Sequence, residues 1–217
     1  MSEKLQLYSL STPNGQKIGI ALEEMGLPYE AHTINILKGD QFKPEFVAIN
    51  PNSKIPALVD PVSRDGKPLS IMESGAILIY LAEKSGKFYS EDPRHRSEIL
   101  QWLFFQVGGV GPMFGQFGHF FKYANDKCTD PYPLDRYTKE AKRILEVLNK
   151  HLENREYFVG ENYTIADMSI LPWVHGLTAF YKADEKLEIA KFAHVTAWVH
   201  RLLDRPKTKL GMSVCSI

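Results

Sequence analysis

The segment Asn52-Ser53-Lys54-Ile55-Pro56-Ala57-Leu58-Val59 decides the fold, together with Ile71-Met72-Glu73-Ser74-Gly75-Ala76 a short way downstream. In the first segment a proline stands at the entrance of an apolar strand, where it donates no ladder hydrogen bond and where a cis peptide is accessible. The second segment ends a strand and begins a helix with a carboxylate and a hydroxyl. We therefore expect exposed backbone at Ile55 and a helix N-terminus at Ser74 to hold a small peptide-like ligand.

Strand and helix patterns alternate on both sides of these segments. Leu5–Ser9 predicts a strand, a helical run follows from Asn14 until Gly26, and residues 29–34 predict a second strand. Residues 57–59 and 69–71 predict an antiparallel hairpin, which the helix beginning near Glu73 follows. The order β-α-β, long link, β-β-α is that of a thioredoxin-like α/β domain, assigned to residues 1–87.

Strand patterns disappear after about residue 90. A polar, proline-marked stretch, residues 91–94, leads into helical patterns that continue to the end of the chain, and the all-α domain is assigned to residues 92–217. Thr164-Ile165-Ala166-Asp167 is a capping box at the start of an apolar helix. Asp167 is accordingly interpreted as a helix cap and not as an active-site acid.

The composition argues against several classes of function. Lysine plus arginine and aspartate plus glutamate both total 26, so no general attraction to nucleic acid or to an anionic membrane is expected. The chain starts without an apolar leader and contains no membrane-length apolar stretch. Cys128 and Cys215 form neither a redox pair nor a metal-binding arrangement, so we expect no metal, a cytoplasmic location and a reacting sulfur that comes from a bound molecule.

The whole set of motifs resembles the cytosolic glutathione transferases across nearly the full length. The similarity is greatest to the nu class and to the fungal nitrogen-regulator-like transferases, in the segments at residues 11–17, 38–42, 88–89 and 101–109. This resemblance implies a homodimer that binds reduced or oxidised glutathione. It also implies pronounced glutathione-dependent disulfide reductase activity and weaker conjugating activity.

The resemblance also implies which residues hold glutathione. The backbone of Ile55, before a cis proline, would pair with the cysteinyl backbone, while Ser74 would bind the γ-glutamyl carboxylate and Glu73 the ammonium. Gln41 and Lys54 would lie at the glycyl end, and Arg136 would reach the ligand from the second domain. Glu73 can equally be a first-turn carboxylate on the helix dipole, and Lys54 and Arg136 can be exposed side chains.

Attack on a disulfide or an electrophile requires the thiolate of glutathione, and a hydrogen-bond donor at the sulfur favours it. The resemblance points to Thr12 as the hydroxyl donor and to Asn14 as a polar neighbour of the sulfur. Ser9, Ser11 and Tyr8 are the competing donors. Thr12 and Asn14 also fit a plain turn and helix cap.

The expected function is reduction of small disulfides by bound glutathione thiolate, with weaker conjugation or peroxidase activity. The same thiolate can attack an electrophilic carbon or a hydroperoxide oxygen, so the cofactor is better specified than the reaction. Two alternatives remain at this point: a non-catalytic glutathione-binding regulatory module, and a carrier of apolar ligands.

Overall fold

The computed structural model describes residues 4–124 and 126–217, which divide into two compact units. The first unit consists of residues 4–89 together with Arg205–Ile217. The second unit is Ser90–Asp204. The two units are described separately below.

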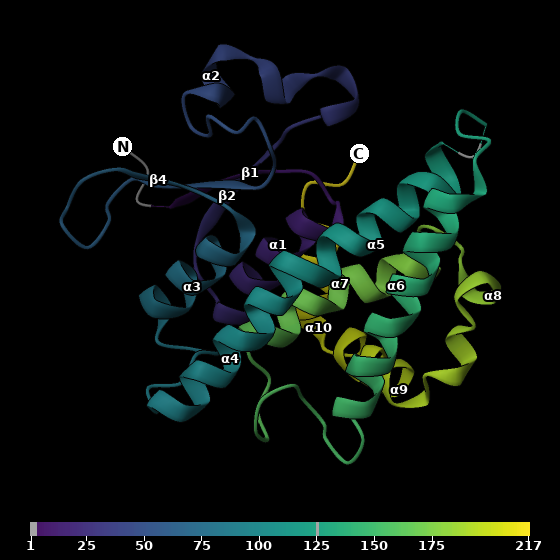
Figure 1. The fold of residues 1–217 in the computed structure, drawn as a ribbon. Helices are drawn as coiled ribbons and strands as arrows, with labels where there is room; N and C mark the ends of the chain where they lie inside the picture. The colour runs from purple at the N-terminus through teal and green to yellow at the C-terminus, as the bar shows by residue number, and fades with distance from the viewer. Residues whose placement is uncertain (1–3, 125) are drawn as a thin grey trace. The chain divides into compact units, whose positions relative to one another are not determined.

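The first unit contains one four-stranded mixed sheet (Figure 1). Its strands are β1 (Leu5–Ser9), β2 (Tyr29–Thr33), β3 (Ala57–Asp60) and β4 (Leu69–Met72), in the spatial order β2-β1-β3-β4. Strands β1 and β2 are parallel, whereas β3 runs antiparallel to both β1 and β4. The predicted β-α-β unit and the predicted hairpin are therefore both present, as is the thioredoxin-like arrangement.

Helices surround this sheet. They are α1 (Pro13–Met25), α2 (Pro44–Val47), α3 (Ser74–Ser85) and α10 (Pro206–Gly211), with short 3₁₀ turns η1 (Ile36–Lys38) and η2 (Asp40–Phe42). Helix α1 ends at Gly26, whose left-handed φ of 71° gives the predicted stop. Leu7 on β1, Ile18 on α1 and Leu58 on β3 are fully buried, so the core lies between the sheet and its helices.

The segment after residue 204 returns to the first unit, which differs from the assignment of residues 92–217 to one helical domain. Figure 1 shows yellow α10 alongside purple α1. Arg205 donates two hydrogen bonds to the buried carboxylate of Glu24 on α1, with Nε–Oε1 and Nη2–Oε2 distances of 2.9 and 2.7 Å. Thr208 donates a third to Oε1 at 2.8 Å. The return depends on pairing between residues far apart in sequence, which helical periodicity cannot reveal.

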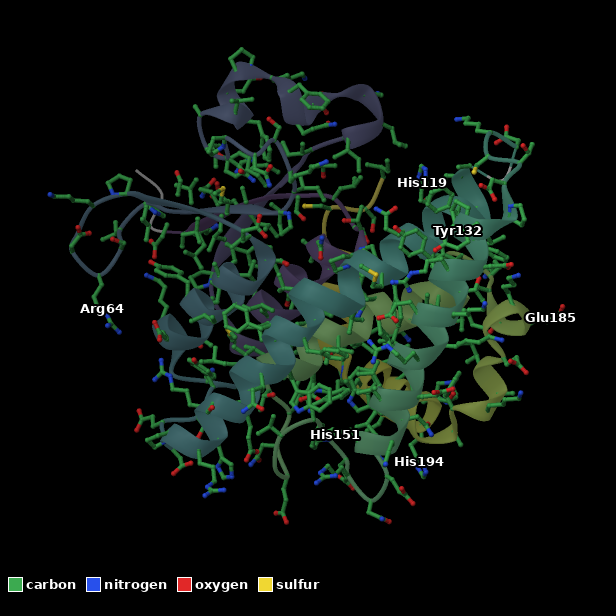
Figure 2. The ribbon with its side chains drawn as sticks, viewed as in Figure 1. Arg64, His119, Tyr132, His151, Glu185 and His194 are labelled. Atoms are coloured by element: carbon green, nitrogen blue, oxygen red, sulfur yellow. The ribbon has the colours of Figure 1, made fainter. Side chains whose placement is uncertain are left out.

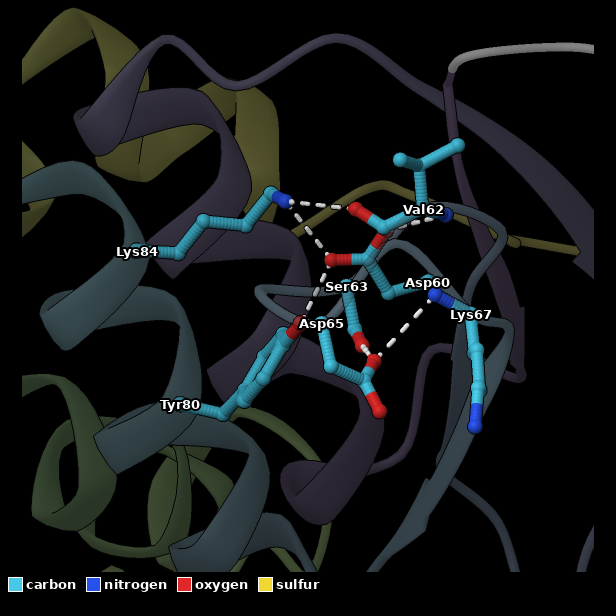
Figure 3. A network of polar contacts seen from close by, with 7 residues as sticks. All are labelled: Asp60, Val62, Ser63, Asp65, Lys67, Tyr80 and Lys84. Carbon is cyan, nitrogen blue, oxygen red and sulfur yellow. Dashed lines mark hydrogen bonds and ion pairs between the residues drawn. The ribbon is translucent and has the colours of Figure 1, made fainter.

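A buried carboxylate at the end of β3 ties the sheet to α3 (Figure 3). Asp60 accepts from the Tyr80 hydroxyl at 2.5 Å and lies 2.7 Å from the Lys84 ammonium. The Val62 N–H donates to the other carboxylate oxygen at 3.0 Å. Burial disfavours the charged form, but these hydrogen bonds outweigh it and hold the pKa of Asp60 below its usual value.

Every regular element of the second unit, among its described residues, is a helix. The elements are α4 (Pro93–Phe105), the π-helical η3 (Gln106–Val110), α5 (Gly111–Gly118), the π-helical η4 (His119–Tyr123), α6 (Pro131–His151), α7 (Ile165–Ala179), α8 (Asp184–Leu187), η5 (Ile189–Lys191, 3₁₀) and α9 (Ala193–Leu203). Of all the helices in the described ranges, none is long and apolar enough to cross a bilayer.

The capping box at the start of α7 is confirmed. The Thr164 hydroxyl accepts from the Ala166 N–H at 3.3 Å, and the Asp167 carboxylate accepts from the Thr164 N–H at 3.0 Å. Asp167 also accepts from the Trp198 indole and from the Phe158 N–H, so it joins three parts of the unit. Burial raises the pKa of Asp167 to about 6 in spite of these hydrogen bonds. Its role here is structural.

Candidate active site

One cavity in the first unit collects most of the predicted ligand-binding residues. It has a volume of about 190 Å³ and is lined by Asn14, Asn50, Asn52, Lys54, Ile55, Pro56, Glu73 and Ser74. These residues come from the start of α1, the loop before β3 and the start of α3. Five of the eight predicted site residues, namely Asn14, Lys54, Ile55, Glu73 and Ser74, therefore meet at one place.

The loop before β3 presents backbone to this cavity. The Ile55–Pro56 peptide is cis. Pairing between β1 and β3 begins at Ala57, so Ile55 lies outside the ladder. Asn50, only 2% exposed, fixes the loop: its amide nitrogen donates to the Lys54 carbonyl at 2.6 Å, and its amide oxygen accepts from the Asn52 N–H at 2.9 Å. This geometry suits antiparallel pairing with an extended peptide.

The start of α3 supplies the polar end of the cavity. Glu73 is the N-cap residue with φ 68° and ψ 117°, a conformation that is strained for a side chain of its size, and its carboxylate makes no capping hydrogen bond. Ser74 begins the helix, so its backbone N–H belongs to the positive end of the helix dipole. An amino-acid head group matches this pair, with its carboxylate at Ser74 and its ammonium at Glu73.

A residue that the sequence analysis did not assign, Lys17, lies directly behind Ser74. Lys17 is 1% exposed, and its ammonium donates to the Ser74 hydroxyl at 3.0 Å. Burial lowers the pKa of Lys17 to about 7, while the nearby Glu73 carboxylate acts in the opposite direction. Lys17, Ala21 and Met25 are spaced four residues apart and therefore lie on the same, apolar face of α1. A lysine at such a position was the sequence signal that would have identified it.

Thr12 and Asn14 lie at the start of α1. Thr12 occupies the N-cap position, yet its side chain makes no capping hydrogen bond. The interpretation of Thr12 as a simple helix cap therefore describes its backbone and not its hydroxyl. Asn14 lines the cavity, while Thr12 is not among the lining residues.

Two of the three competing hydroxyls, those of Ser9 and Ser11, donate elsewhere, and the ring of Tyr8 is stacked. Ser9 Oγ donates to the Leu10 carbonyl at 3.3 Å, and the Tyr8 ring stacks on His32 with centroids 4.6 Å apart. Ser11 Oγ donates to the Met212 carbonyl at 2.8 Å. The Ser11 N–H also donates to the Cys215 carbonyl at 3.2 Å, so the segment after α10 holds the loop that leads into Thr12.

Two predicted residues are placed differently. Gln41 does not line the cavity; its amide nitrogen donates to the Ile36 carbonyl at 3.4 Å, and its buried amide oxygen has no hydrogen-bond partner among the described residues. Arg136 is an exposed residue of α6 in the second unit. His119, labelled in Figure 2, is also exposed and packs edge-on against Phe120 in that unit.

Family models identify the class of protein that this fold and site define. The N-terminal domain of glutathione S-transferase matches residues 12–84, and the C-terminal domain of glutathione S-transferase matches residues 117–206. The chain belongs to the glutathione S-transferase family, as its sequence motifs indicated.

Comparison with individual proteins shows which members of this family the chain is similar to. The chain is 48% identical to the disulfide-bond oxidoreductase YfcG of Escherichia coli K12, over 94% of this chain and 92% of that protein. A glutathione transferase family member from Pseudomonas fluorescens, solved with two glutathione bound, superposes with a TM-score of 0.96 at 50% identity, covering 98% of this chain and 93% of that one. A Pseudomonas putida glutathione transferase, solved with one glutathione disulfide bound per subunit, gives a TM-score of 0.94 at 49% identity, with coverage of 97% and 91%.

Proposed function

We propose that this protein is a glutathione-dependent disulfide-bond reductase. The observation that carries the proposal is the single cavity shared by Ile55, Glu73 and Ser74, because it presents a backbone edge and an amino-acid head-group site side by side. Glutathione needs both features, one for its cysteinyl backbone and one for its γ-glutamyl end. The names of the relatives, which include a disulfide-bond oxidoreductase, agree with this chemistry.

Each proposed contact follows from the position of its residue. Ser74 and the first N–H groups of α3 bind the γ-glutamyl carboxylate, and Glu73 binds the ammonium. Lys54 neutralises the glycyl carboxylate. Gln41 lies outside the lining of the cavity, so we propose that it contacts the glycyl end only after its side chain turns. Arg136 is proposed as a further contact from the second unit. We also propose that the protein belongs to the nu class, forms a homodimer and is cytoplasmic.

The proposed reaction uses two molecules of glutathione. The first, bound as thiolate, attacks one sulfur of a disulfide, so that a mixed disulfide forms and one thiolate leaves. A second glutathione thiolate attacks the glutathione sulfur of the mixed disulfide, which releases the second thiol and yields glutathione disulfide. Two electrons pass from the two glutathione sulfurs to the substrate, and no cysteine of the protein takes part.

Thr12 and Asn14 are proposed to stabilise the bound thiolate. A hydroxyl that does not cap its helix is available to donate to a sulfur, and such a donor lowers the thiol pKa. The lower pKa raises the thiolate fraction near neutral pH, where free glutathione is mostly protonated.

The test measures turnover of hydroxyethyl disulfide and of an aromatic electrophile in parallel, for wild type, Thr12→Val, Asn14→Ala and the matched control Thr12→Ser. We expect disulfide reduction to exceed conjugation, Thr12→Val and Asn14→Ala to lose at least about tenfold in disulfide turnover, and Thr12→Ser to retain most of it. Undiminished turnover in both Thr12→Val and Asn14→Ala would rule out this sulfur site. Glutathione binding without turnover of either substrate would instead favour a non-catalytic binding module.

A further inference from the structure

The buried ammonium of Lys17 donates a hydrogen bond to a residue of the cavity wall, Ser74. Its Nζ atom lies 3.0 Å from Ser74 Oγ, and both side chains are buried, at 1% and 8% exposure. Ser74 lines the cavity, whereas Lys17 is not among the lining residues. Lys17 can therefore act on a ligand through the Ser74 hydroxyl.

The protonation state of Lys17 decides where the Ser74 hydroxyl points. An ammonium group can only donate, and a serine hydroxyl has one proton and two acceptor lone pairs. When Lys17 is charged, Ser74 accepts from it and keeps its own proton for another acceptor. When Lys17 is neutral, its lone pair can accept the Ser74 proton, and the hydroxyl then presents only lone pairs to the cavity.

We propose that Lys17 is a positioning residue that makes carboxylate binding at Ser74 proton-coupled: the ligand binds together with one proton, which Lys17 takes from solvent. A charged Lys17 turns the Ser74 hydroxyl toward the carboxylate and places a buried positive charge behind it. The inference rests on the proposed function, because the carboxylate concerned is that of the γ-glutamyl group.

The electrostatic surroundings favour such a coupling. Burial lowers the pKa of Lys17 to about 7, so we expect both charged and neutral Lys17 in the unliganded protein near neutral pH. The carboxylate of Glu73, just before α3, raises the pKa of Lys17 in opposition to burial. Among the other charged groups on and around α1, Arg205 and Lys207 of α10 act on Glu24, Lys84 of α3 acts on Asp60, and Glu23 of α1 accepts a hydrogen bond from Tyr29.

A carboxylate arriving at Ser74 stabilises the ammonium form, so the pKa of Lys17 rises on binding. Linkage then fixes the pH dependence. Affinity is highest when Lys17 is already charged, below pH 7, and falls as pH rises because the proton must first be taken up. For a group whose pKa lies near 7 in the free protein and is strongly raised by the ligand, the limiting loss of affinity between pH 6 and pH 8 is about tenfold.

Isothermal titration calorimetry with S-methylglutathione tests the coupling, since this ligand has no thiol to titrate. Titrations at pH 6 and pH 8, each in two buffers of different ionisation enthalpy, give the number of protons taken up per site. For the wild type we expect proton uptake to approach one per site at pH 8 and to be much smaller at pH 6. Lys17→Met should lose this uptake, and the residual value measures any contribution from the ligand's own ammonium.

Lys17→Arg is the matched control, because it keeps the charge and does not titrate in this range. It should show no proton uptake and a flat affinity between pH 6 and pH 8. Thermal unfolding checks that both variants are folded, and the wild-type measurement stands without them. Wild-type binding with no proton uptake at pH 8 would overturn this inference alone. Failure of S-methylglutathione to bind at either pH would overturn the proposed function as well.

Discussion

The carbonyl oxygen of Gly211 lies only 2.3 Å from the position that a Cβ atom on Gly19 would occupy. Conversely, a Cβ on Gly211 would lie 2.4 Å from the Cα of Ile20. Helices α1 and α10 are thus in direct backbone contact through two glycines. A side-chain movement cannot make room for a methyl group at either glycine, since the obstructing atoms belong to the backbone.

Gly19→Ala should therefore destabilise the protein by about 1–3 kcal/mol, because the added methyl group forces the two helices apart. Urea unfolding followed by circular dichroism measures the loss. Gly108→Ala is the control: it lies in a helix with nothing within 4 Å of the added carbon, so stability should stay constant or rise by up to about 1 kcal/mol. Equal effects at the two positions would contradict the close contact.

Arg205→Met should cost about 3–5 kcal/mol, because it leaves the Glu24 carboxylate buried without its bidentate partner. Arg205→Lys should cost less, since a positive charge remains but the fork geometry is lost. Unfolding midpoints in urea compare the three proteins. An unchanged midpoint for Arg205→Met would show that α10 is not held by this pair.

The same pair predicts a reversal of pH dependence. Burial raises the pKa of Glu24, but the hydrogen bonds from Arg205 and Thr208 outweigh it and hold the pKa below normal. The wild-type contribution is therefore complete above the unfolded-state pKa of about 4.5 and is lost as pH falls through the folded-state value. In Arg205→Met, burial dominates and the folded-state pKa exceeds the unfolded one, so this group should make stability decline as pH rises from about 4.5. Urea midpoints at pH 4 and pH 7 would reveal the opposite slopes.

Tyr80→Phe removes one donor from the Asp60 carboxylate and should destabilise the protein by about 1.5–3 kcal/mol. Tyr132→Phe, at a residue that is 70% exposed, should change nothing and serves as the control (Figure 2). Chemical denaturation of both variants and of the wild type measures these changes in the free energy of unfolding. A neutral Tyr80→Phe would mean that Lys84 and the Val62 N–H satisfy Asp60 on their own.

Removal of residues 213–217 should lower disulfide turnover while glutathione binding persists. The deletion takes away the Cys215 carbonyl that accepts from the Ser11 N–H, and so it loosens the loop before Thr12 without touching Ile55 or Ser74. We expect kcat to fall several-fold with KM for glutathione little changed. Cys215→Ala is the matched control, since it keeps the carbonyl and removes only the thiol. Loss of activity in Cys215→Ala would point to the thiol in place of the backbone contact.

Much of the first unit could be predicted from the sequence because its signals are local. The predicted strand Leu5–Ser9 matches β1 in full, where buried and half-buried residues alternate, and Gly26 ends α1 as expected. The start of α6 was not predicted: the helix begins at Pro131, where Asp130 caps it through the Tyr132 N–H. An aspartate followed by proline was a usable signal.

The parts that sequence reasoning missed depend on distant contacts. Lys17 shares a helix face with Ala21 and Met25, but its contact with Ser74 arises only from the approach of α3. Likewise, nothing in the run from Arg205 onward distinguishes another helix of the second unit from one that packs on α1. Asn50 and Asn52 reach the cavity wall only through the fold of the loop before β3.

The return of α10 to α1 also sets an order of events during synthesis. Residues 205–217 leave the ribosome only after the whole of Ser90–Asp204, so the helical unit is completely synthesised before the thioredoxin-like unit receives its last helix. Until then, Glu24 and the small surface around Gly19 stay uncovered on the nascent chain, and the loop that carries Thr12 lacks its support from Met212 and Cys215. The thioredoxin-like half begins translation first and is the half completed last.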